Sequence, residues 1–325
     1  MDRGCLMKTI AFTTLGCKVN EYDTQAMREL FEAAGWQSVP FSQEADVYLI
    51  NTCTVTSTGD GKSMKTIRRT AREHPQAELI VTGCLAQKDA ERVAVEGVRL
   101  VIGSARRGEV VSLLARAREQ GKCLVAVESL KNVPFERLQV GKHEEKTRAV
   151  MKIQEGCDRY CAYCIIPYVR GPVRSMPLED VRAEAARLAQ AGYKEIVLTG
   201  IHLASYGRGT EDTLIDAIRA VSEPEGVARV RLGSLEPLLI TPEFLAEAVR
   251  CEKICPQFHL SMQSGSAGVL RRMNRRYTPG QYEQACALLR EAFPGCAITT
   301  DVITGFPGET EEEYLETEEF VKKIG

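Results

Sequence analysis

The sequence lacks the features that would place it in a membrane, a secreted or a disordered class. No apolar run approaches the roughly 18–20 residues that a membrane-spanning helix needs. The N-terminus has no charged start followed by a long apolar stretch and a cleavage site, so no secretory signal is evident. Hydrophobic residues at 44% and charged residues at 26% exclude a disordered or collagen-like chain. We therefore expect a globular protein of the cytoplasm, without a membrane partner.

The chain also lacks an excess of either charge. Its 42 lysine and arginine residues are balanced by 44 aspartate and glutamate residues, for a net charge of −2. This balance neither demands nor excludes a nucleic-acid partner, because a neutral protein can carry a local basic face. The length of 325 residues is enough for two domains.

Cysteine, by contrast, is abundant. The chain has 12 cysteines, and without a secretory signal a disulfide framework is not expected, because the cytosol keeps thiols reduced. Cysteines clustered at short spacing in such a protein indicate metal or redox chemistry. The others are expected to be small buried hydrophobic residues.

The first part of the chain alternates strand-like and helix-like segments, which predicts a parallel sheet covered on both faces. Strands are expected at 8–13, 46–50 and 78–81, and helices at 22–34 and 62–73. A cysteine follows each strand within about four residues: these are Cys17, Cys53 and Cys84.

The carboxyl ends of parallel strands gather at one edge of a sheet, where ligands of open α/β domains bind. We therefore expect these three cysteines to converge. Three separate buried thiols are the alternative.

The second part repeats the alternation. Strands are expected at 149–154, 195–198, 229–232, 257–262 and 297–303, and helices at 177–191, 214–221, 242–251, 279–292 and 309–324. Strands that are each followed by a helix predict a partial (β/α) barrel, whose site lies at the carboxyl ends of the strands. The fold class is thus α/β, with an open parallel-sheet domain (1–127), a linker (128–148) and a partial barrel (149–325). The chain stops where a sixth strand is expected, which suggests a fragment.

The strongest motif is a CxxxCxxC directly after the first barrel strand, formed by Cys157, Cys161 and Cys164. Three thiolates suit a cubane 4Fe-4S cluster and leave one of its irons open to an added ligand. A structural zinc ion usually has four protein ligands, and the sequence offers no well-spaced fourth ligand nearby. Zinc therefore remains the weaker interpretation.

This motif resembles that of the radical S-adenosylmethionine (radical SAM) superfamily, for which the resemblance implies a barrel of the radical SAM type. There the open iron binds S-adenosylmethionine, and one electron from the cluster cleaves it to a 5′-deoxyadenosyl radical. Tyr163, before the third cysteine, corresponds to an aromatic residue that lies against the adenine in many members.

The resemblance narrows to the methylthiotransferases, in which three further cysteine motifs hold a second, auxiliary 4Fe-4S cluster with an open iron that delivers the sulfur unit. The matching segments are 14–20 (TLGCKVN), 51–56 (NTCTVT), 82–87 (TGCLAQ), 164–168, 170–175 (RGPVRS), 198–202, 234–237, 259–265 (HLSMQSG) and 300–309. The resemblance thus implies that all six cysteines act in catalysis through their two clusters. We expect the two clusters to face one another across the domain junction. It also implies an electron donor of the flavodoxin or ferredoxin type and a sulfur donor.

Residues 14–27, 153–161 and 271–278 resemble the branch that adds a methylthio group to carbon 2 of N-threonylcarbamoyladenosine, beside the tRNA anticodon. Sister branches act on isopentenyladenosine in tRNA or on an aspartate of a ribosomal protein. Two competing interpretations are a different sulfur-inserting radical enzyme and a non-catalytic iron–sulfur module. The family's C-terminal RNA-binding domain has no counterpart in this sequence.

Two further sets of residues are candidates for binding. Residues at the ends of consecutive barrel strands are expected to contact the cofactor or substrate, although ordinary turn chemistry also explains them: Thr199, Gly200, Ser234, Glu236 and Gln263. Basic residues that could neutralise phosphates of the tRNA anticodon stem-loop, or merely form a solvated helix face, are Lys62, Lys65, Arg68, Arg69 and Arg72, with Arg271, Arg272, Arg275 and Arg276.

Overall fold

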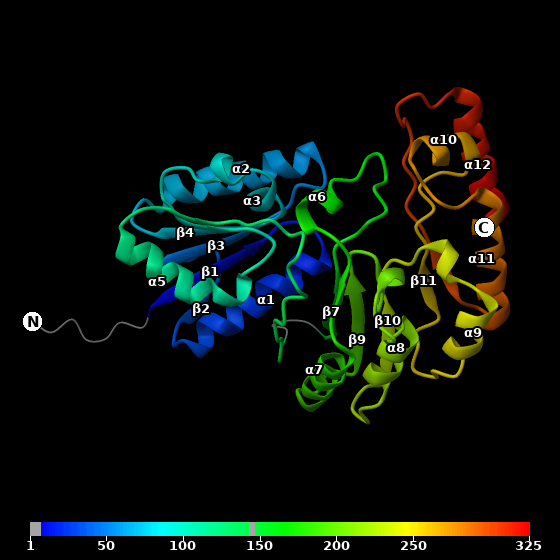
Figure 1. Cartoon of the computed structure of the whole chain (residues 1–325), viewed down its shortest axis with the longest axis horizontal. Helices are drawn as coiled ribbons and strands as arrows, with labels where there is room; N and C mark the ends of the chain where they lie inside the picture. The colour runs from blue at the N-terminus through cyan, green and yellow to red at the C-terminus, as the bar shows by residue number, and fades with distance from the viewer. Residues whose placement is uncertain (1–7, 143–146) are drawn as a thin grey trace, which may run out of the picture. The chain divides into compact units, whose positions relative to one another are not determined.

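The computed structural model describes residues 8–142 and 147–325 (Figure 1); the N-terminal heptapeptide and residues 143–146 of the expected linker lie outside them. The chain forms two compact units. We call the first the N-terminal unit: it holds the described residues up to Val140 and a second piece, Ile165–Pro172. The C-terminal unit holds the remainder, Gly141–Cys164 and Val173–Gly325. None of the described helices is both long and apolar enough to cross a membrane.

The N-terminal unit contains an open, wholly parallel sheet with the strand order β2-β1-β3-β4-β5-β6. Figure 1 labels β1, β2, β3 and β4 of this sheet. Its strands are β1 (Thr9–Thr14), β2 (Gln37–Val39), β3 (Val47–Thr52), β4 (Glu78–Gly83), β5 (Val98–Ile102) and β6 (Leu124–Ala126). The open parallel sheet that the sequence predicted is confirmed. The three strands found from the sequence, β1, β3 and β4, are neighbours in the sheet. The strands that it missed flank them, with β2 on one side and β5 and β6 on the other.

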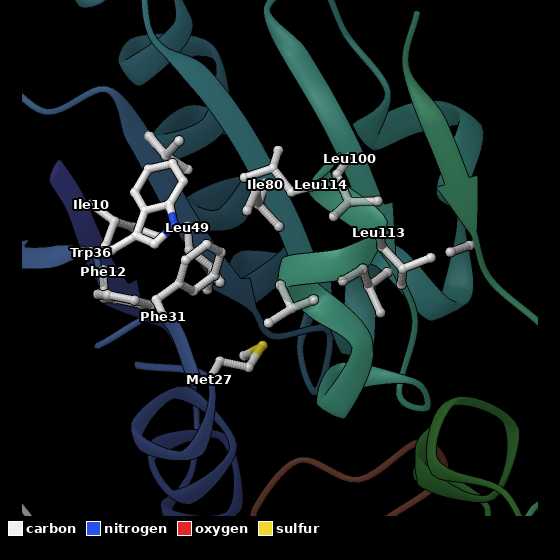
Figure 2. Close-up of a cluster of buried hydrophobic side chains, with 14 residues drawn as sticks. Ile10, Phe12, Met27, Phe31, Trp36, Leu49, Ile80, Leu100, Leu113 and Leu114 are labelled. Atoms are coloured by element: carbon white, nitrogen blue, oxygen red, sulfur yellow. The ribbon is translucent and has the colours of Figure 1, made fainter. Parts of the chain in front are cut away.

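Helices cover both faces of this sheet, and the strand residues alternate between them. Leu49 of β3 packs with α1 (Lys18–Ala33) and α5 (Val110–Gln120), in the core that Figure 2 shows. Its neighbours Tyr48 and Ile50 pack on the other face with α2 (Ser57–Glu73). The remaining helical segments of this unit are α3 (Cys84–Lys88), α4 (Ala90–Val93), η1 (Arg107–Glu109) and α6 (Ile166–Arg170). Every residue of β3 is buried, because a strand covered on both faces has no solvent side.

Truncation of this core is expected to destabilise the N-terminal unit. Leu49→Ala removes a fully buried side chain and is expected to cost about 2–5 kcal/mol in the free energy of unfolding. Trp36, the only tryptophan of the chain, lies in the same core, so the urea dependence of its fluorescence reports on this unit. Val125→Ala, at a half-exposed valine of the same sheet, is the control and is expected to change stability by less than about 1 kcal/mol. Equal losses in the two variants would contradict the assignment of the core.

Part of the expected linker packs against the N-terminal unit. Tyr22 of α1 donates a hydrogen bond to the carbonyl of Leu138 at 2.9 Å, and Leu138 and Val140 form a buried cluster with Tyr22 and Ala26. Residues 128–140 thus form part of this unit although they contain neither helix nor strand.

The C-terminal unit is a partial barrel, as the sequence predicted. Parallel strands β7, β9 and β10 form a sheet to which β8 adds in the antiparallel direction, and β11 and β12 form a second parallel pair. Isolated bridges Val230↔Ile254 and Leu235↔Leu260 continue the pairing from β10 to the β11 segment. The strands are β7 (Ala149–Glu155), β8 (Arg174–Ser175), β9 (Glu195–Gly200), β10 (Arg229–Leu232), β11 (Gln257–His259) and β12 (Ala297–Thr299).

Two strands end earlier than the apolar pattern predicted, because a side chain replaces their ladder bonds. The hydroxyl of Thr300 donates to the carbonyl of Leu260 at 2.6 Å and accepts from the backbone N–H of Met262 at 3.0 Å. These contacts interrupt the ladder at the ends of β11 and β12.

Several helices of this unit begin at threonine caps. Thr213, Thr278 and Thr310 each form a capping box, in which the threonine and the third helical residue satisfy one another's backbone N–H groups. The cap at Thr310 explains why the last helix begins at Glu311, two residues later than predicted. The helical segments are α7 (Leu178–Gln190), η2 (Leu203–Ser205), α8 (Leu214–Ser222), η3 (Pro237–Leu239), α9 (Pro242–Ala248), α10 (Ala267–Arg272), α11 (Pro279–Ala292) and α12 (Glu311–Ile324).

Candidate metal centres

The first candidate site lies at the carboxyl ends of three adjacent parallel strands in the N-terminal unit. Cys17 lies on the loop between β1 and α1, Cys53 directly follows β3, and Cys84 directly follows β4. Cys17 is exposed, Cys53 is half-buried and Cys84 is buried. Burial raises the pKa of the Cys84 thiol, and this effect outweighs the lowering effect of the nearby Arg170 guanidinium. The structure thus gathers the three thiols that the sequence expected to converge.

Glycines allow the cysteine loops to approach so closely. Gly16 has a φ of 108°, and a Cβ there would lie 2.9 Å from both Cβ and Sγ of Cys53. Gly83 has a φ of 94°, and a Cβ there would lie 2.3 Å from Oδ1 of Asn51 and 2.4 Å from the carbonyl oxygen of Thr52. Both positions combine left-handed backbone with no room for a side chain. The glycine before each cysteine in LGC and TGC is therefore a geometric requirement.

Two buried asparagines hold the same loops together. Asn20 of α1 donates to the carbonyl of Leu15 at 2.7 Å and to that of Thr52 at 3.0 Å, which joins the loops after β1 and β3. Asn51 at the end of β3 donates to the carbonyl of Asn20 at 3.0 Å. The polar residues in the TLGCKVN and NTCTVT motifs thus fix the positions of the cysteines.

An arginine from the second piece of the N-terminal unit contacts this site. Arg170 is fully buried, and its Nε donates to Sγ of Cys84 at 3.2 Å. Its Nη1 donates to Asp23 at 2.9 Å and its Nη2 to the Asn20 side chain. Arg107 also donates to Asp23. The sequence motifs contained Arg170, Asn20 and Asp23, but sequence reasoning gave them no role.

The second candidate site is the loop that carries Cys157, Cys161 and Cys164 after β7. Gln154 of β7 donates from Nε2 to the carbonyls of Glu155 and Gly156, at 2.9 and 2.8 Å. Further along, the segment after α10 supports the loop from outside: the N–H of Ala162 donates to the carbonyl of Met273 at 2.9 Å, and the Asn274 side chain donates to the carbonyl of Tyr160 at 2.9 Å. The backbone of Tyr160 is left-handed, with a φ of 48°. Burial raises the pKa of Cys157.

Arg275 contacts this loop and is partly buried, whereas the sequence placed it in a basic segment that faces solvent or RNA. Its Nη1 donates to Sγ of Cys161 at 3.2 Å, and its Nε donates to the hydroxyl of Tyr277 at 3.1 Å. The Tyr277 hydroxyl lies 2.5 Å from the carbonyl of Ser261, and burial raises the pKa of Tyr277 to about 12. The left-handed turn at Asn274, with a φ of 57°, ends the helical segment before Arg275. Each cysteine triad therefore has one arginine whose N–H group donates to a cysteine sulfur, with a nitrogen–sulfur distance of 3.2 Å.

The residues that the sequence placed at the ends of the barrel strands lie at or just after these strands in the structure. Thr199 and Gly200 end β9, and a Cβ on Gly200 would lie 2.8 Å from Cβ of Gln154, so this strand end packs directly against β7. Tyr163 is 38% exposed, and its ring meets Phe306 edge-on at a centroid distance of 6.3 Å. Burial raises the pKa of Tyr163.

Ser234 is exposed after β10. Gln263 has left-handed backbone, with a φ of 67°, and bridges to Val302.

Glu236 is the most strongly engaged of the strand-end residues. It is buried, its Oε2 lies 2.5 Å from Nη2 of Arg159 in the cysteine loop, and Nε2 of His202 lies 3.2 Å from the same oxygen. Burial opposes the charge, yet His202 and Arg159 hold the pKa of Glu236 below its usual value. Glu236 thus ties the cysteine loop to the ends of β9 and β10, a link that sequence reasoning missed.

The basic residues of α2 share an exposed face. Lys62, Lys65, Arg68, Arg69 and Arg72 are all exposed. Arg69 forms only a loose pair with Glu73 at 3.7 Å. In the second basic segment Arg271 and Arg276 are exposed, whereas Arg272 forms a two-point ion pair with Glu313. The α2 face is therefore the more available of the two for an anionic partner.

The donor sets suit iron–sulfur clusters better than a mononuclear ion. Each site offers three soft thiol ligands, the type that iron–sulfur clusters use. Within residues 8–142 and 147–325, no group of three or more histidine, cysteine, aspartate or glutamate side chains is placed to hold a single metal ion. The ligands of a cubane cluster do not have to meet at one metal ion, because each thiolate binds a different iron. The residues present therefore fit two three-thiolate clusters.

Comparison with known proteins agrees with this geometry. Residues 151–321 match the family described as the radical SAM superfamily, and residues 9–103 match one described as "Uncharacterized protein family UPF0004". A radical SAM methyltransferase, TsrM, from Kitasatospora setae has a similar fold, with a TM-score of 0.70 at 14% identity, over 98% of this chain and 71% of that one. The fold and the three-cysteine loop thus define a radical SAM enzyme.

Two curated relatives narrow the class. The Threonylcarbamoyladenosine tRNA methylthiotransferase MtaB of Bacillus subtilis is 46% identical over 323 residues, covering 98% of this chain and 71% of the relative. A tRNA-2-methylthio-N(6)-dimethylallyladenosine synthase of Syntrophobacter fumaroxidans is 36% identical over 326 residues, covering 96% and 70%. The chain belongs to the radical SAM methylthiotransferase family, whose members use S-adenosylmethionine and 4Fe-4S clusters.

Proposed function

We propose that this protein adds a methylthio group to carbon 2 of N-threonylcarbamoyladenosine in tRNA, beside the anticodon. The observation that carries the proposal is the pair of three-cysteine sites, one per unit, each at the carboxyl ends of parallel strands and each contacted by an arginine N–H. The choice of nucleoside rests on similarity: the relative named for threonylcarbamoyladenosine is 46% identical, and the one named for dimethylallyladenosine is 36% identical. A tRNA substrate also implies that the protein works in the cytoplasm.

The six cysteines would hold the two clusters. Cys157, Cys161 and Cys164 would bind the radical-generating cluster, and Cys17, Cys53 and Cys84 the auxiliary one. When bound, the radical-generating cluster would supply an electron for the cleavage of S-adenosylmethionine, and the auxiliary cluster would supply a sulfur unit for transfer to the base. An external electron donor of the flavodoxin or ferredoxin type and a sulfur donor complete the proposed set of partners.

The chain's own residues would position the cofactor and the loop. Tyr163 is exposed and is proposed to lie against the adenine of S-adenosylmethionine. Glu236 holds Arg159, and Gln154 holds the carbonyls before Cys157, so the loop is shaped before the cofactor arrives. The other proposed contacts to the cofactor or substrate come from Thr199, Gly200, Ser234 and Gln263.

The proposal is tested by reconstituting the protein anaerobically and incubating it with S-adenosylmethionine, dithionite and two purified tRNAs. One tRNA carries threonylcarbamoyladenosine beside the anticodon, and the other carries isopentenyladenosine. Mass spectrometry of the nucleosides is expected to show the methylthio product from the first tRNA alone. Product only from the second tRNA would assign the protein to the sister branch. Cleavage of S-adenosylmethionine without a methylthio product from either tRNA would refute the proposed transfer.

The exposed face of α2 is proposed to contact tRNA phosphates. Replacing Lys62, Lys65 and Arg68 by alanine is expected to weaken tRNA binding and to lower the slope of log K against log salt by about 0.7–0.9 for each phosphate that is no longer neutralised. Filter binding from low to moderate salt measures the slope. The matched control removes three exposed cations elsewhere, at Arg182, Arg229 and Lys322. A slope that falls equally in both triple variants would argue for a general charge effect and against a binding face on α2.

A further inference from the structure

Arg170 reaches the N-terminal unit from a part of the chain that lies far away in sequence. The segment Ile165–Pro172 starts immediately after Cys164 and is counted within the N-terminal unit. Gly171, with a φ of 70°, closes this segment: a Cβ there would lie 2.6 Å from Cβ of the buried Leu130. The close packing at Gly171 fixes the preceding residue, so the position of Arg170 is determined by backbone contacts and not by a flexible side chain alone.

Every nitrogen of the Arg170 guanidinium has a partner. Nη1 and Nη2 bond to the carboxylate of Asp23 and the amide oxygen of Asn20, and this leaves Nε pointing at Sγ of Cys84, 3.2 Å away. The guanidinium group of arginine is planar and holds its N–H donors in a fixed arrangement, which the single ammonium group of lysine does not. The contact with sulfur is therefore set by two other anchored bonds.

The charge of Arg170 is balanced locally, which offsets the free-energy cost of burying it completely. Asp23 accepts from both Arg170 and Arg107, and Arg107 also donates to Glu136 at 2.7 Å and to the carbonyl of Ser104 at 2.9 Å. Two guanidinium groups and two carboxylates thus form one network. Within this network, Arg170 donates to a cysteine sulfur.

We propose that Arg170 is a positioning residue of the auxiliary cluster, whose Nε–H bond to Cys84 fixes that sulfur and raises the reduction potential of the cluster. The inference rests on the proposed function, because it takes Cys17, Cys53 and Cys84 as cluster ligands. Hydrogen bonds to cluster sulfurs are among the factors that set the potential. A donor N–H stabilises the electron-richer, reduced state, so removal of the donor lowers the potential.

The test isolates the auxiliary cluster in the full-length chain. Cys157, Cys161 and Cys164 are replaced together by alanine, and the protein is reconstituted with iron and sulfide. Iron is expected at about 4 per chain, from one cubane. Titration with dithionite, followed by electron paramagnetic resonance, gives the one-electron potential of that cluster. Arg170→Met in this background is expected to shift the potential to more negative values and to alter the spectrum of the reduced cluster.

Two further variants separate the hydrogen bond from the fold and from the charge. Arg170→Lys retains a positive charge beside Asp23 but lacks the planar guanidinium group, and it is expected to shift the potential in the same direction by less. If Arg170→Met does not bind the cluster, the potential is measured in Arg170→Lys instead. Arg107→Met removes a guanidinium from the same Asp23 and is expected to leave the potential unchanged.

The outcomes distinguish this inference from the function on which it rests. No iron in the triple-alanine background would overturn the assignment of the auxiliary site itself. A loaded cluster whose potential is the same with Arg170 in place, in Arg170→Met and in Arg170→Lys would overturn the role of Arg170 alone. Equal shifts in Arg170→Met and Arg107→Met would also overturn it, because the effect would then come from the charge of the whole network.

Discussion

Cys157→Ala is expected to abolish the formation of 5′-deoxyadenosine from S-adenosylmethionine, to the level seen without reconstituted iron. The proposed cluster has three protein ligands, so the loss of one leaves two, and the radical-generating site is expected to lose its iron. Iron per chain is expected to fall from about 8 to about 4, because each cubane holds four irons. Chromatography of the S-adenosylmethionine products under dithionite measures the effect.

The control for this variant is Cys251→Ala, the same substitution at a buried cysteine that lies outside both triads. It is expected to retain iron and 5′-deoxyadenosine formation. Trp36 fluorescence, which reports on the N-terminal unit, should be the same in both variants. If Cys157→Ala still produced 5′-deoxyadenosine, the CxxxCxxC loop would not be the site of the radical chemistry.

The positions of the two sites were predictable from sequence because they depend on strand ends. A cysteine after each of three parallel strands has to come to the same edge of the sheet, and Cys17, Cys53 and Cys84 do follow the adjacent strands β1, β3 and β4. The edge strand Gln37–Val39 was missed because three residues carry little periodicity. The position of each cysteine and the missed strand both follow from the apolar pattern of short segments of sequence.

The residues that support the cysteines were not predictable in this way, because their contacts join distant parts of the chain. Arg170 meets Cys84 across 86 residues, and Arg275 meets Cys161 across 114. In the sequence both are simply basic residues, and Arg275 lies in a run that is typical of an exposed helix face. The left-handed residue Asn274 separates it from Arg271 and Arg272, a backbone turn that composition does not reveal.

Cys84→Ala is expected to separate the two halves of the reaction. The radical SAM loop belongs to the other unit, so the variant should still form 5′-deoxyadenosine while it makes no methylthio nucleoside. Iron is expected to fall to about 4 per chain, from the loss of one cubane. The assay measures both products in one reaction, with S-adenosylmethionine, dithionite and tRNA that carries threonylcarbamoyladenosine.

Cys123→Ala is the matched control, because Cys123 is a half-buried thiol of the same unit that packs against the hydrophobic core. It is expected to give both products. If Cys84→Ala lost 5′-deoxyadenosine as well, the two sites would depend on one another for assembly. If it still made the methylthio nucleoside, the sulfur would have to come from elsewhere than a cluster on Cys17, Cys53 and Cys84. Only the retention of the radical step together with the loss of sulfur transfer supports one distinct role for each triad.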